Sequence, residues 1–543
     1  MQSANGLWPP EFAARYRRQG YWTGQTLGSV LAQWAQRYDS RNALVDGGRR
    51  LSYRDLDLQA DRLAAGLAKR GMRAGDRVVV QLPNITEFVV LCFALFRLGS
   101  LPILAPPGLR RHEISQLCAT AEAIAYVVAD QYQGFDYLEL ARDVLNDVRS
   151  VREVLVVGES GRYPTLNEID APPRSFPLPD AGGVALFLLS GGTTGTPKLI
   201  PRTHDDYIYN MRVSAGNAGL DTSSVYLAVL PVTHNFALAC PGILGCLDAG
   251  GRVVLSASAS PDDAFPLIQN EKVTVSALVP ALAILWTRMV PLLKFDLSSL
   301  RLLQVGGSKL DEDAARRIGP AFGCRLQQSF GMAEGLLCQS RLDDPETILV
   351  TTQGRPLSAD DEIRIVDEDD QDVGSGEPGE LLARGPYTIR SYFRADDCNR
   401  ESFTADGYFR TGDMARMTAD GNLVIVGRRK DVINRGGDKV PAGEVEDHLL
   451  THPGVTEAAV VAMPDSLLGE RTCAYVVAAP GHHFSLSDLA DLLQARNLAP
   501  FKIPDRLEFV SSMPRTSVGK IDKAHLRRDI ASRLAAENHQ CSG

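Results

Sequence analysis

Residues 188–206, LLSGGTTGTPKLIPRTHDD, join an apolar run to a loop of glycines and hydroxyl side chains that ends in a lysine. Glycine permits the positive φ angles that bring backbone N–H groups close to an anion, and hydroxyl and ammonium groups donate further hydrogen bonds. The residues that supply these groups are Ser190, Gly191, Gly192, Thr193, Thr194, Gly195, Thr196 and Lys198. The segment predicts a loop that binds nucleotide phosphates, with a flexible surface loop as the alternative.

The lysine of this loop separates it from the Walker A loop of P-loop nucleotidases. That pattern requires a glycine directly before the lysine, whereas Pro197 precedes Lys198 here. A P-loop fold is therefore excluded.

Composition limits the classes of protein to which the chain can belong. Its 543 residues are too many for one ordinary core, so two or more domains are expected. A net charge of −9 gives no basic face for nucleic acid. The longest apolar run, residues 88–96, is too short to span a membrane and is expected to form a buried helix. The absence of a signal peptide and of paired cysteines favours a cytoplasmic location.

Apolar runs alternate with helical patterns through much of the chain. Leu56, Ala60, Leu63 and Leu67 share one face of a predicted helix that precedes an apolar run at 78–82. Further strands are expected at 125–128, 184–189, 252–255 and 300–305. This alternation predicts a large domain of α/β layers.

The character of the sequence changes twice after residue 350. Short strands at 362–366, 379–383 and 423–426 predict a β-rich subdomain over about 355–427. A charged segment then leads into a pattern of helix, strand and helix. We expect an N-terminal core over 1–429 and a small, mobile α+β domain over 430–543.

Six separated segments carry most of the candidate chemistry. They are SGGTTGTPK (190–198), LPVTHNFAL (230–238), SFGMAEG (329–335), YFRTGD (408–413), GRRKD (427–431) and PRTSVGKIDK (514–523). Their order and character resemble those of the adenylate-forming superfamily, which includes acyl-CoA ligases, adenylation domains of peptide synthetases and luciferases. The resemblance implies that a carboxylate attacks the α-phosphate of ATP, giving an acyl adenylate and pyrophosphate, and that a thiol then captures the acyl group.

The resemblance also implies roles for individual residues toward ATP and Mg²⁺. Thr193, Thr194 and Lys198 would hold the β- and γ-phosphates, and Glu334 would help to bind Mg²⁺, a hard cation that suits a carboxylate. Phe330 would lie against adenine, while Asp413 and Arg428 would reach the ribose. The remaining residues expected around the nucleotide are Ser190, Gly191, Gly307, Ser329, Gly331 and Met332.

Three further roles are implied by the same resemblance. Lys520 would bridge the carboxylate and the α-phosphate as a catalytic cation. Lys430 would be the hinge about which the C-terminal domain rotates between the half-reactions, and Gly436 and Gly437 would line the tunnel for phosphopantetheine. His234 would lie near the entry of the carboxylate as a catalytic residue, although a structural histidine is an equal alternative.

The acid is predicted from residues near the second segment. Members that activate amino acids use an aspartate to pair the substrate ammonium, whereas this chain has Asn235. HNF followed by Cys240 is similar to stand-alone aryl-acid-activating enzymes of siderophore biosynthesis, most of all the salicylate-AMP ligases of the pyochelin and yersiniabactin type. Phe236, Ser308, Ala333 and Leu337 would form the remaining walls of the acid site.

Cys240 bears on the choice between salicylate and 2,3-dihydroxybenzoate. In the resembling group this position is typically cysteine in salicylate enzymes and serine in dihydroxybenzoate enzymes. A thiol is a weak hydrogen-bonding group, and an unsatisfied buried hydroxyl costs about 1 to 3 kcal/mol, so salicylate is favoured. The alternative for Cys240 is a small core residue.

The thiol acceptor is left open between two partners. The phosphopantetheine arm of an aryl carrier protein and free CoA would both accept an aryl group from the adenylate. Because no carrier module follows Arg533, a carrier protein would have to be a separate chain. A luciferase-type oxygenase and a nucleotide-sensing module are lesser alternatives, and the second is disfavoured because the ATP-handling residues are retained.

Overall fold

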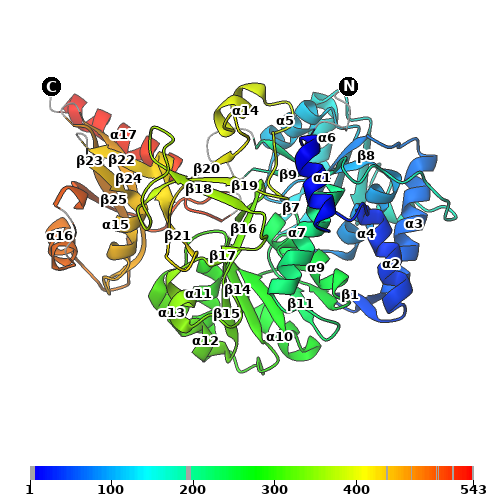
Figure 1. The fold of residues 1–543 in the computed structure, drawn as a ribbon, viewed down its shortest axis with the longest axis horizontal. Coiled ribbons are helices and arrows are strands. Elements are labelled where there is room, and N and C mark those ends of the chain that lie inside the picture. The colour runs from blue at the N-terminus through cyan, green and yellow to red at the C-terminus, as the bar shows by residue number, and fades with distance from the viewer. Residues whose placement is uncertain are drawn as a thin grey trace. The chain divides into compact units, whose positions relative to one another are not determined.

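The computed structural model describes residues 7–159, 161–190, 197–435, 438–465, 468–496, 498, 500–516 and 519–540. The chain forms two compact units (Figure 1). The larger unit contains the described residues up to Ile363 together with Ala383–Phe409, and the smaller unit contains Arg364–Leu382 and the described residues from Arg410 onward. A hinge at Lys430, and with it the boundary between 1–429 and 430–543, stays a prediction.

A nine-stranded sheet forms the first framework of the larger unit. Its central strands pair in parallel, and antiparallel strands close both edges. The order is β17 (Arg355–Pro356), β16 (Gly335–Gln339), β15 (Arg325–Met332), β14 (Leu302–Gly306), β13 (Val275–Leu278), β11 (Val225–Ala228), β12 (Arg252–Leu255), β1 (Asn42–Asp46) and β2 (Arg49–Ser52).

A six-stranded sheet forms the second framework of this unit. Its order is β10 (Leu199–Thr203), β9 (Val184–Leu189), β4 (Leu101–Leu104), β3 (Arg77–Gln81), β5 (Ala125–Ala129) and β8 (Glu153–Val157). All its pairings are parallel except that of β9 with β10. Both faces are buried, as expected of parallel strands covered by crossover helices.

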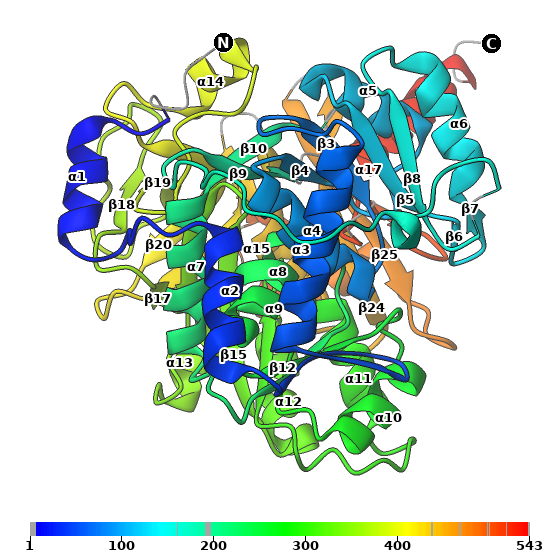
Figure 2. The same cartoon turned by 90° about the vertical axis from the view of Figure 1, so that its right-hand side faces the viewer.

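Helices fill the space between the two sheets. Val78 and Val80 of β3 contact the same core cluster as Val253 and Leu255 of β12, whereas Val79 faces an outer cluster, because successive side chains of a strand point to opposite faces. The inner helices include α2, α3 and α4, which lie side by side (Figure 2). This layer comprises α2 (Leu27–Tyr38), α3 (Tyr53–Lys69), α4 (Thr86–Leu98), α7 (His204–Asn217), α8 (Asn235–Ala239) and α9 (Gly242–Asp248).

Two further helical layers cover the outer faces of the sheets. Phe265, Trp286 and Ile318 pack on the nine-stranded sheet, and Leu117 and Leu140 pack on the six-stranded sheet. Figure 1 shows these two groups of helices on opposite sides of the unit. The outer helices are α10 (Pro261–Glu271), α11 (Pro280–Met289), α12 (Glu312–Phe322) and α13 (Glu346–Thr351) on the first sheet, with α5 (Arg111–Ala121) and α6 (Tyr137–Asp147) on the second. The predicted architecture of α/β layers is confirmed.

Shorter elements complete the larger unit. They are α1 (Pro10–Arg18), β6 (Gln131–Tyr132), β7 (Phe135–Asp136), η2 (Leu166–Glu168) and α14 (Asp396–Ser402). Within the described part of the chain, none of the helices is long and apolar enough to cross a membrane.

The β-rich subdomain is a four-stranded sheet through which the division into units passes. Its order is β18 (Glu362–Val366), β19 (Gly379–Arg384), β20 (Phe409–Met417) and β21 (Leu423–Arg428). β20 and β21 are antiparallel, so Asp413 lies opposite Arg428.

The rest of the smaller unit packs helices on both faces of one sheet. Val445 and Leu489 contact one face, and Leu526 and Ile530 contact the other. The elements, in chain order, are η3 (Arg429–Asp431), β22 (Val432–Arg435), β23 (Asp438–Pro441), α15 (Ala442–Leu449), β24 (Val455–Asp465), β25 (Gly469–Ala478), α16 (Leu486–Ala495), η4 (Pro500–Lys502), β26 (Arg506–Phe509) and α17 (Lys523–Gln540).

Candidate active site

The predicted phosphate loop connects β9 and β10. Gly191, Thr193 and Thr194 lie outside the described residues, so their roles stay predictions. Both ends of the loop are described, and they bond to each other: the backbone N–H of Ser190 donates to the carbonyl of Lys198 at 3.0 Å, and the N–H of Lys198 donates to Ser190 Oγ at 3.0 Å. These two bonds hold the ends of the loop together and fix the position of the Lys198 backbone.

Lys198 and Glu334 meet at a residue that the sequence interpretation missed. The Nζ of Lys198 lies 4.9 Å from the ring centroid of Tyr392, and the Tyr392 hydroxyl donates to Glu334 Oε1 at 2.8 Å. Glu334 and Tyr392 are 8% and 5% exposed. A cation over the face of an aromatic ring and a buried carboxylate are thus joined through one tyrosine.

Backbone contacts hold the Tyr392 segment against the Glu334 turn. The N–H of Ile389 donates to the carbonyl of Glu334 at 2.7 Å. Gly335 has a φ of 144°, and a Cβ there would lie 2.3 Å from Thr388 Cα. Only glycine fits this close approach, which explains the glycine after the acidic residue in SFGMAEG.

The donor set fits Mg²⁺ carried by a nucleotide better than a metal held by protein alone. Among the described residues, no group of three or more histidine, cysteine, aspartate or glutamate side chains is placed to hold a metal ion. Mg²⁺ is commonly bound through one or two carboxylates together with substrate phosphates and waters. Glu334 beside Lys198 is consistent with that arrangement.

The residues expected around adenine follow two neighbouring strands. β14 and β15 are parallel, with Gly306 opposite Ser329, so Gly307 follows β14 beside the end of β15. Ser329 is buried and its Oγ accepts from Gln339 Nε2 at 3.2 Å. Phe330 and Met332 are half-buried, whereas Gly307, Ser308 and Gly331 are exposed. The carboxyl ends of parallel strands are the usual ligand-binding edge of an α/β sheet.

Five of the six predicted acid-site residues are buried or half-buried. Cys240 and Leu337 form a small core cluster with Tyr387, and Phe236 packs against it. Asn235 begins α8, and its Oδ1 accepts from the Tyr207 hydroxyl at 2.9 Å. Of the other two predicted wall residues, Ala333 is half-buried and Ser308 is exposed.

Two electrostatic features distinguish these residues. Burial raises the pKa of the Cys240 thiol to about 12, so the side chain stays neutral at physiological pH. Tyr207 contributes a neutral hydroxyl and Asn235 a neutral amide, and neither neutralises an ammonium group.

His234 directly precedes α8. It is half-buried, and its backbone N–H donates to the carbonyl of Pro231 at 3.0 Å. The preceding loop is held by Asn84, whose Nδ2 donates to the carbonyls of Ala228 and Leu230. The catalytic role of His234 stays a prediction.

The two residues expected at the ribose form an ion pair in the smaller unit. Arg428 Nε lies 2.7 Å from Asp413 Oδ1. Asp413 is buried, and its N–H donates to Thr411 Oγ1 at 3.0 Å. The pair is a cross-strand contact of β20 and β21, and it fixes the carboxylate in one orientation.

Lys520 and Lys430 also belong to the smaller unit. Lys520 is exposed on a turn in which the N–H of Thr516 donates to the Lys520 carbonyl at 2.7 Å. The backbone of Lys430 lies in η3. Gly436 and Gly437 lie outside the described residues.

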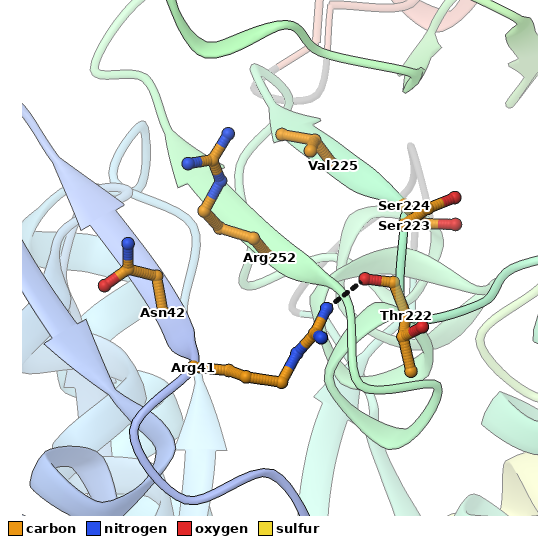
Figure 3. A pocket seen from close by; sticks show the side chains of 7 residues that line it. All are labelled: Arg41, Asn42, Thr222, Ser223, Ser224, Val225 and Arg252. Carbon is orange, nitrogen blue, oxygen red and sulfur yellow. Dashed lines mark hydrogen bonds between the residues drawn. The ribbon is translucent and has the colours of Figure 1, made fainter.

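One surface pocket is lined by none of these residues. It has a volume of about 260 Å³ and is lined by Arg41, Asn42, Thr222, Ser223, Ser224, Val225 and Arg252. Figure 3 shows the guanidinium of Arg41 bonded to the carbonyl of Thr222. None of its lining residues belongs to the predicted site.

Comparisons with known proteins identify the family of the chain. Residues 31–393 match the family model described as AMP-binding enzyme, and residues 444–520 match the AMP-binding enzyme C-terminal domain. A 2,3-dihydroxybenzoate-AMP ligase of Bacillus subtilis is 53% identical over 97% of this chain and 98% of its own length. The pyochelin synthase PchD of Pseudomonas aeruginosa is 51% identical over 97% of both chains. The apo structure of MbtA from Mycobacterium smegmatis has a TM-score of 0.76 at 47% identity, covering 96% of this chain and 98% of that one.

Proposed function

The chain belongs to the AMP-binding enzyme family, and from that membership we propose that it activates salicylate with ATP and transfers the salicyl group to a carrier-protein thiol. In the first step a carboxylate oxygen of the acid bonds to the α-phosphorus of ATP, the bond to the β-phosphate oxygen breaks, and pyrophosphate leaves. In the second step the thiol sulfur bonds to the carbonyl carbon and AMP leaves. The thiol proton passes to solvent.

The contact of Lys198, Tyr392 and Glu334 is the observation that carries the first step. Adenylation moves negative charge onto the leaving pyrophosphate, so a positioned cation beside the phosphates lowers the barrier. Lys198 supplies that cation, and Tyr392 contacts both Lys198 and Glu334. Glu334 would hold Mg²⁺, which neutralises phosphate charge when it is bound.

Asp413 and Lys520 complete the proposed adenylating set. Asp413, whose Oδ1 pairs with Arg428, is proposed to accept hydrogen bonds from the ribose hydroxyls. Lys520 is proposed to approach the acid carboxylate and the α-phosphate, where it stabilises the charge that develops on the transferring group.

Asn235 and Cys240 support an aryl acid. PchD and the Bacillus ligase are both close relatives, and the second is a 2,3-dihydroxybenzoate-AMP ligase. Salicylate is proposed over 2,3-dihydroxybenzoate because the thiol of Cys240 is a poor partner for a buried 3-hydroxyl. The relative with 53% identity makes 2,3-dihydroxybenzoate the second candidate.

Ion pairs on both sides of Lys430 support a hinge there. Arg429 Nη1 lies 2.6 Å from Glu380 Oε2 of β19. Asp431 instead pairs with Arg527 of α17, and its Oδ2 lies 4.0 Å from the Nζ of Lys523 in the same helix. Because neighbours of Lys430 are tied to different elements, rotation is proposed to concentrate at Lys430.

The direct test is ATP–pyrophosphate exchange across a panel of acids. Salicylate should support the fastest exchange, 2,3-dihydroxybenzoate a slower rate, and α-amino acids none. Exchange driven by an amino acid but by no benzoic acid would refute the proposal. Thioester yield on an aryl carrier protein compared with CoA then tests the acceptor, since greater yield on CoA would contradict the carrier assignment.

A further inference from the structure

A fully buried arginine lies among the predicted acid-site residues without a role in the proposed chemistry. Arg202 of β10 has no exposed side-chain surface. Burying a guanidinium is costly unless hydrogen-bond acceptors surround it. The acceptors of Arg202 therefore indicate which neighbouring groups its charge holds in place.

Each nitrogen of Arg202 reaches a different acceptor. Nε donates to Asp206 Oδ1 at 2.8 Å, and Nη2 donates to Asn210 Oδ1 at 3.4 Å. Asp206 and Asn210 are four residues apart, so they share one face of α7. Nη1 donates to the carbonyl of Ala333 at 3.0 Å. One side chain thus joins α7 to the segment between β15 and β16.

These contacts determine the orientation of the Asn210 amide. A guanidinium only donates, so Oδ1 of Asn210 must face Arg202. The opposite side of the amide, Nδ2, donates to the carbonyl of Ala239 at 2.7 Å and to Cys240 Sγ at 3.7 Å. The sulfur of Cys240 therefore accepts a hydrogen bond from the Asn210 amide, whose orientation Arg202 helps to fix.

The same arginine acts on Asn235 through Tyr207. Its Cζ lies 4.8 Å from the Tyr207 ring centroid, and the Tyr207 hydroxyl donates to Asn235 Oδ1. Burial raises the pKa of Tyr207 well above its usual range, which keeps the hydroxyl protonated. The nearby cation also makes the phenol a better donor. With Oδ1 engaged, Nδ2 is the polar group that Asn235 offers to an acid.

We propose that Arg202, Tyr207 and Asn210 form a buried network of positioning residues that sets the hydrogen-bonding polarity of the acid site. The network turns Nδ2 of Asn235 toward the ortho substituent of the aryl acid. An N–H donor suits the oxygen of a 2-hydroxybenzoate and opposes the N–H groups of a 2-aminobenzoate. This inference rests on the proposed function. It adds the residues that make the acid site prefer a 2-hydroxyl to a 2-amino substituent.

The test removes one hydroxyl and has a matched control on the same helix. Tyr207→Phe frees the Asn235 amide to rotate, whereas Tyr209→Phe removes a hydroxyl that donates to Ser358 at 2.8 Å. The ratio of kcat/KM for salicylate to that for 2-aminobenzoate should fall about tenfold in Tyr207→Phe and stay unchanged in Tyr209→Phe. A loss of folding would lower both rates and leave the ratio in place.

A double-mutant cycle assigns the effect to Asn235. In an Asn235→Ala background, adding Tyr207→Phe should leave the ratio unchanged. An unaltered ratio in the single Tyr207→Phe variant, or an equal change in both backgrounds, would overturn the inference. Substitution of Arg202 is avoided because it would leave Asp206 as an unpaired buried charge.

A double-mutant cycle measured on protein stability, without substrate, distinguishes failure of this inference from failure of the proposed function. The unfolding midpoints of Tyr207→Phe, Asn235→Ala and the double variant should be non-additive, because both single substitutions break the same bond. Additive effects would refute the network even if salicylate is activated. If no aryl acid supports exchange while the cycle is non-additive, the proposed function fails and the hydrogen bond stands.

Discussion

The hydroxyl of Tyr392 donates a hydrogen bond to Glu334 Oε1 at 2.8 Å, across 58 positions of sequence. The ring of the same tyrosine lies under Lys198. Tyr392 therefore couples the proposed metal-binding carboxylate to the proposed phosphate-binding cation, and we expect it to be a positioning residue for adenylation.

Tyr392→Phe is expected to slow adenylation by about tenfold or more, because a hydrogen bond to a charged group contributes about 1.5 to 3 kcal/mol. The loss should appear mainly in the Mg²⁺ concentration that gives half-maximal ATP–pyrophosphate exchange. Tyr408→Phe is the matched control, since the Tyr408 hydroxyl also donates to a glutamate, Glu362, at 3.2 Å. Equal behaviour of the two variants would contradict the role of Tyr392.

Lys520→Ala is expected to reduce adenylate formation by roughly 10²-fold or more, as removal of an oxyanion-hole donor does. Thioester formation from supplied salicyl adenylate should be largely retained, because the lysine is proposed to act only in the first half-reaction. Lys523→Ala does not serve as a control, since Lys523 pairs with Glu446 at 2.7 Å. Lys520→Arg is the better comparison because it keeps the charge. Similar losses in both half-reactions of Lys520→Ala would refute the assignment.

Lys430→Pro should selectively block the thiol step, because proline fixes φ near −65° and prevents rotation at that residue. Pre-steady-state adenylation should persist, whereas transfer from bound adenylate to the acceptor thiol should fall. Lys430→Ala removes the side chain but keeps backbone freedom, so it should transfer normally. Normal transfer by the proline variant would exclude a hinge at this position.

His204 gives the larger unit a specific dependence on pH. It is buried and neutral, its Nδ1 accepts from the N–H of Leu27 at 3.1 Å, and burial lowers its pKa from 6.5 to about 4. Between these values the unfolded chain binds more protons than the folded chain. Stability is therefore fully present above about pH 6.5 and falls as the pH drops toward 4.

The expected loss from His204 is about 3 kcal/mol, since each pKa unit corresponds to about 1.4 kcal/mol. Urea unfolding at a series of pH values should show that His204→Gln, which cannot titrate, lacks this part of the acid sensitivity. Parallel pH profiles for the two proteins would show that His204 does not carry the effect.

Much of the fold could be predicted because local pattern and tertiary packing agree. Strands β9 and β12 occupy the predicted ranges 184–189 and 252–255. The predicted helix with Leu56 and Leu67 on its buried face begins at Tyr53, where Ser52 caps it. Boundaries were less accurate: the strand expected at 300–305 is β14, Leu302–Gly306. Ends depend on hydrogen bonds to neighbouring strands, which periodicity does not reveal.

The site was predicted as a set of motifs, and its connecting residues were missed. Lys198 and Glu334 stand out because their segments have a distinctive composition. Tyr392 and Tyr207 resemble ordinary core tyrosines in sequence, and only the fold brings their hydroxyls to Glu334 and Asn235. Contacts between distant segments arise from packing, so no local pattern announces them.

The most direct measurement is the product formed from salicylate, ATP and Mg²⁺ when no thiol is present. Salicyl-AMP and pyrophosphate are expected in equal amounts, detected by mass spectrometry after a single turnover. Formation of ADP and phosphate would contradict activation of the acid by adenylation. Release of AMP with no aryl adenylate formed from any of the benzoic acids tested would contradict it as well.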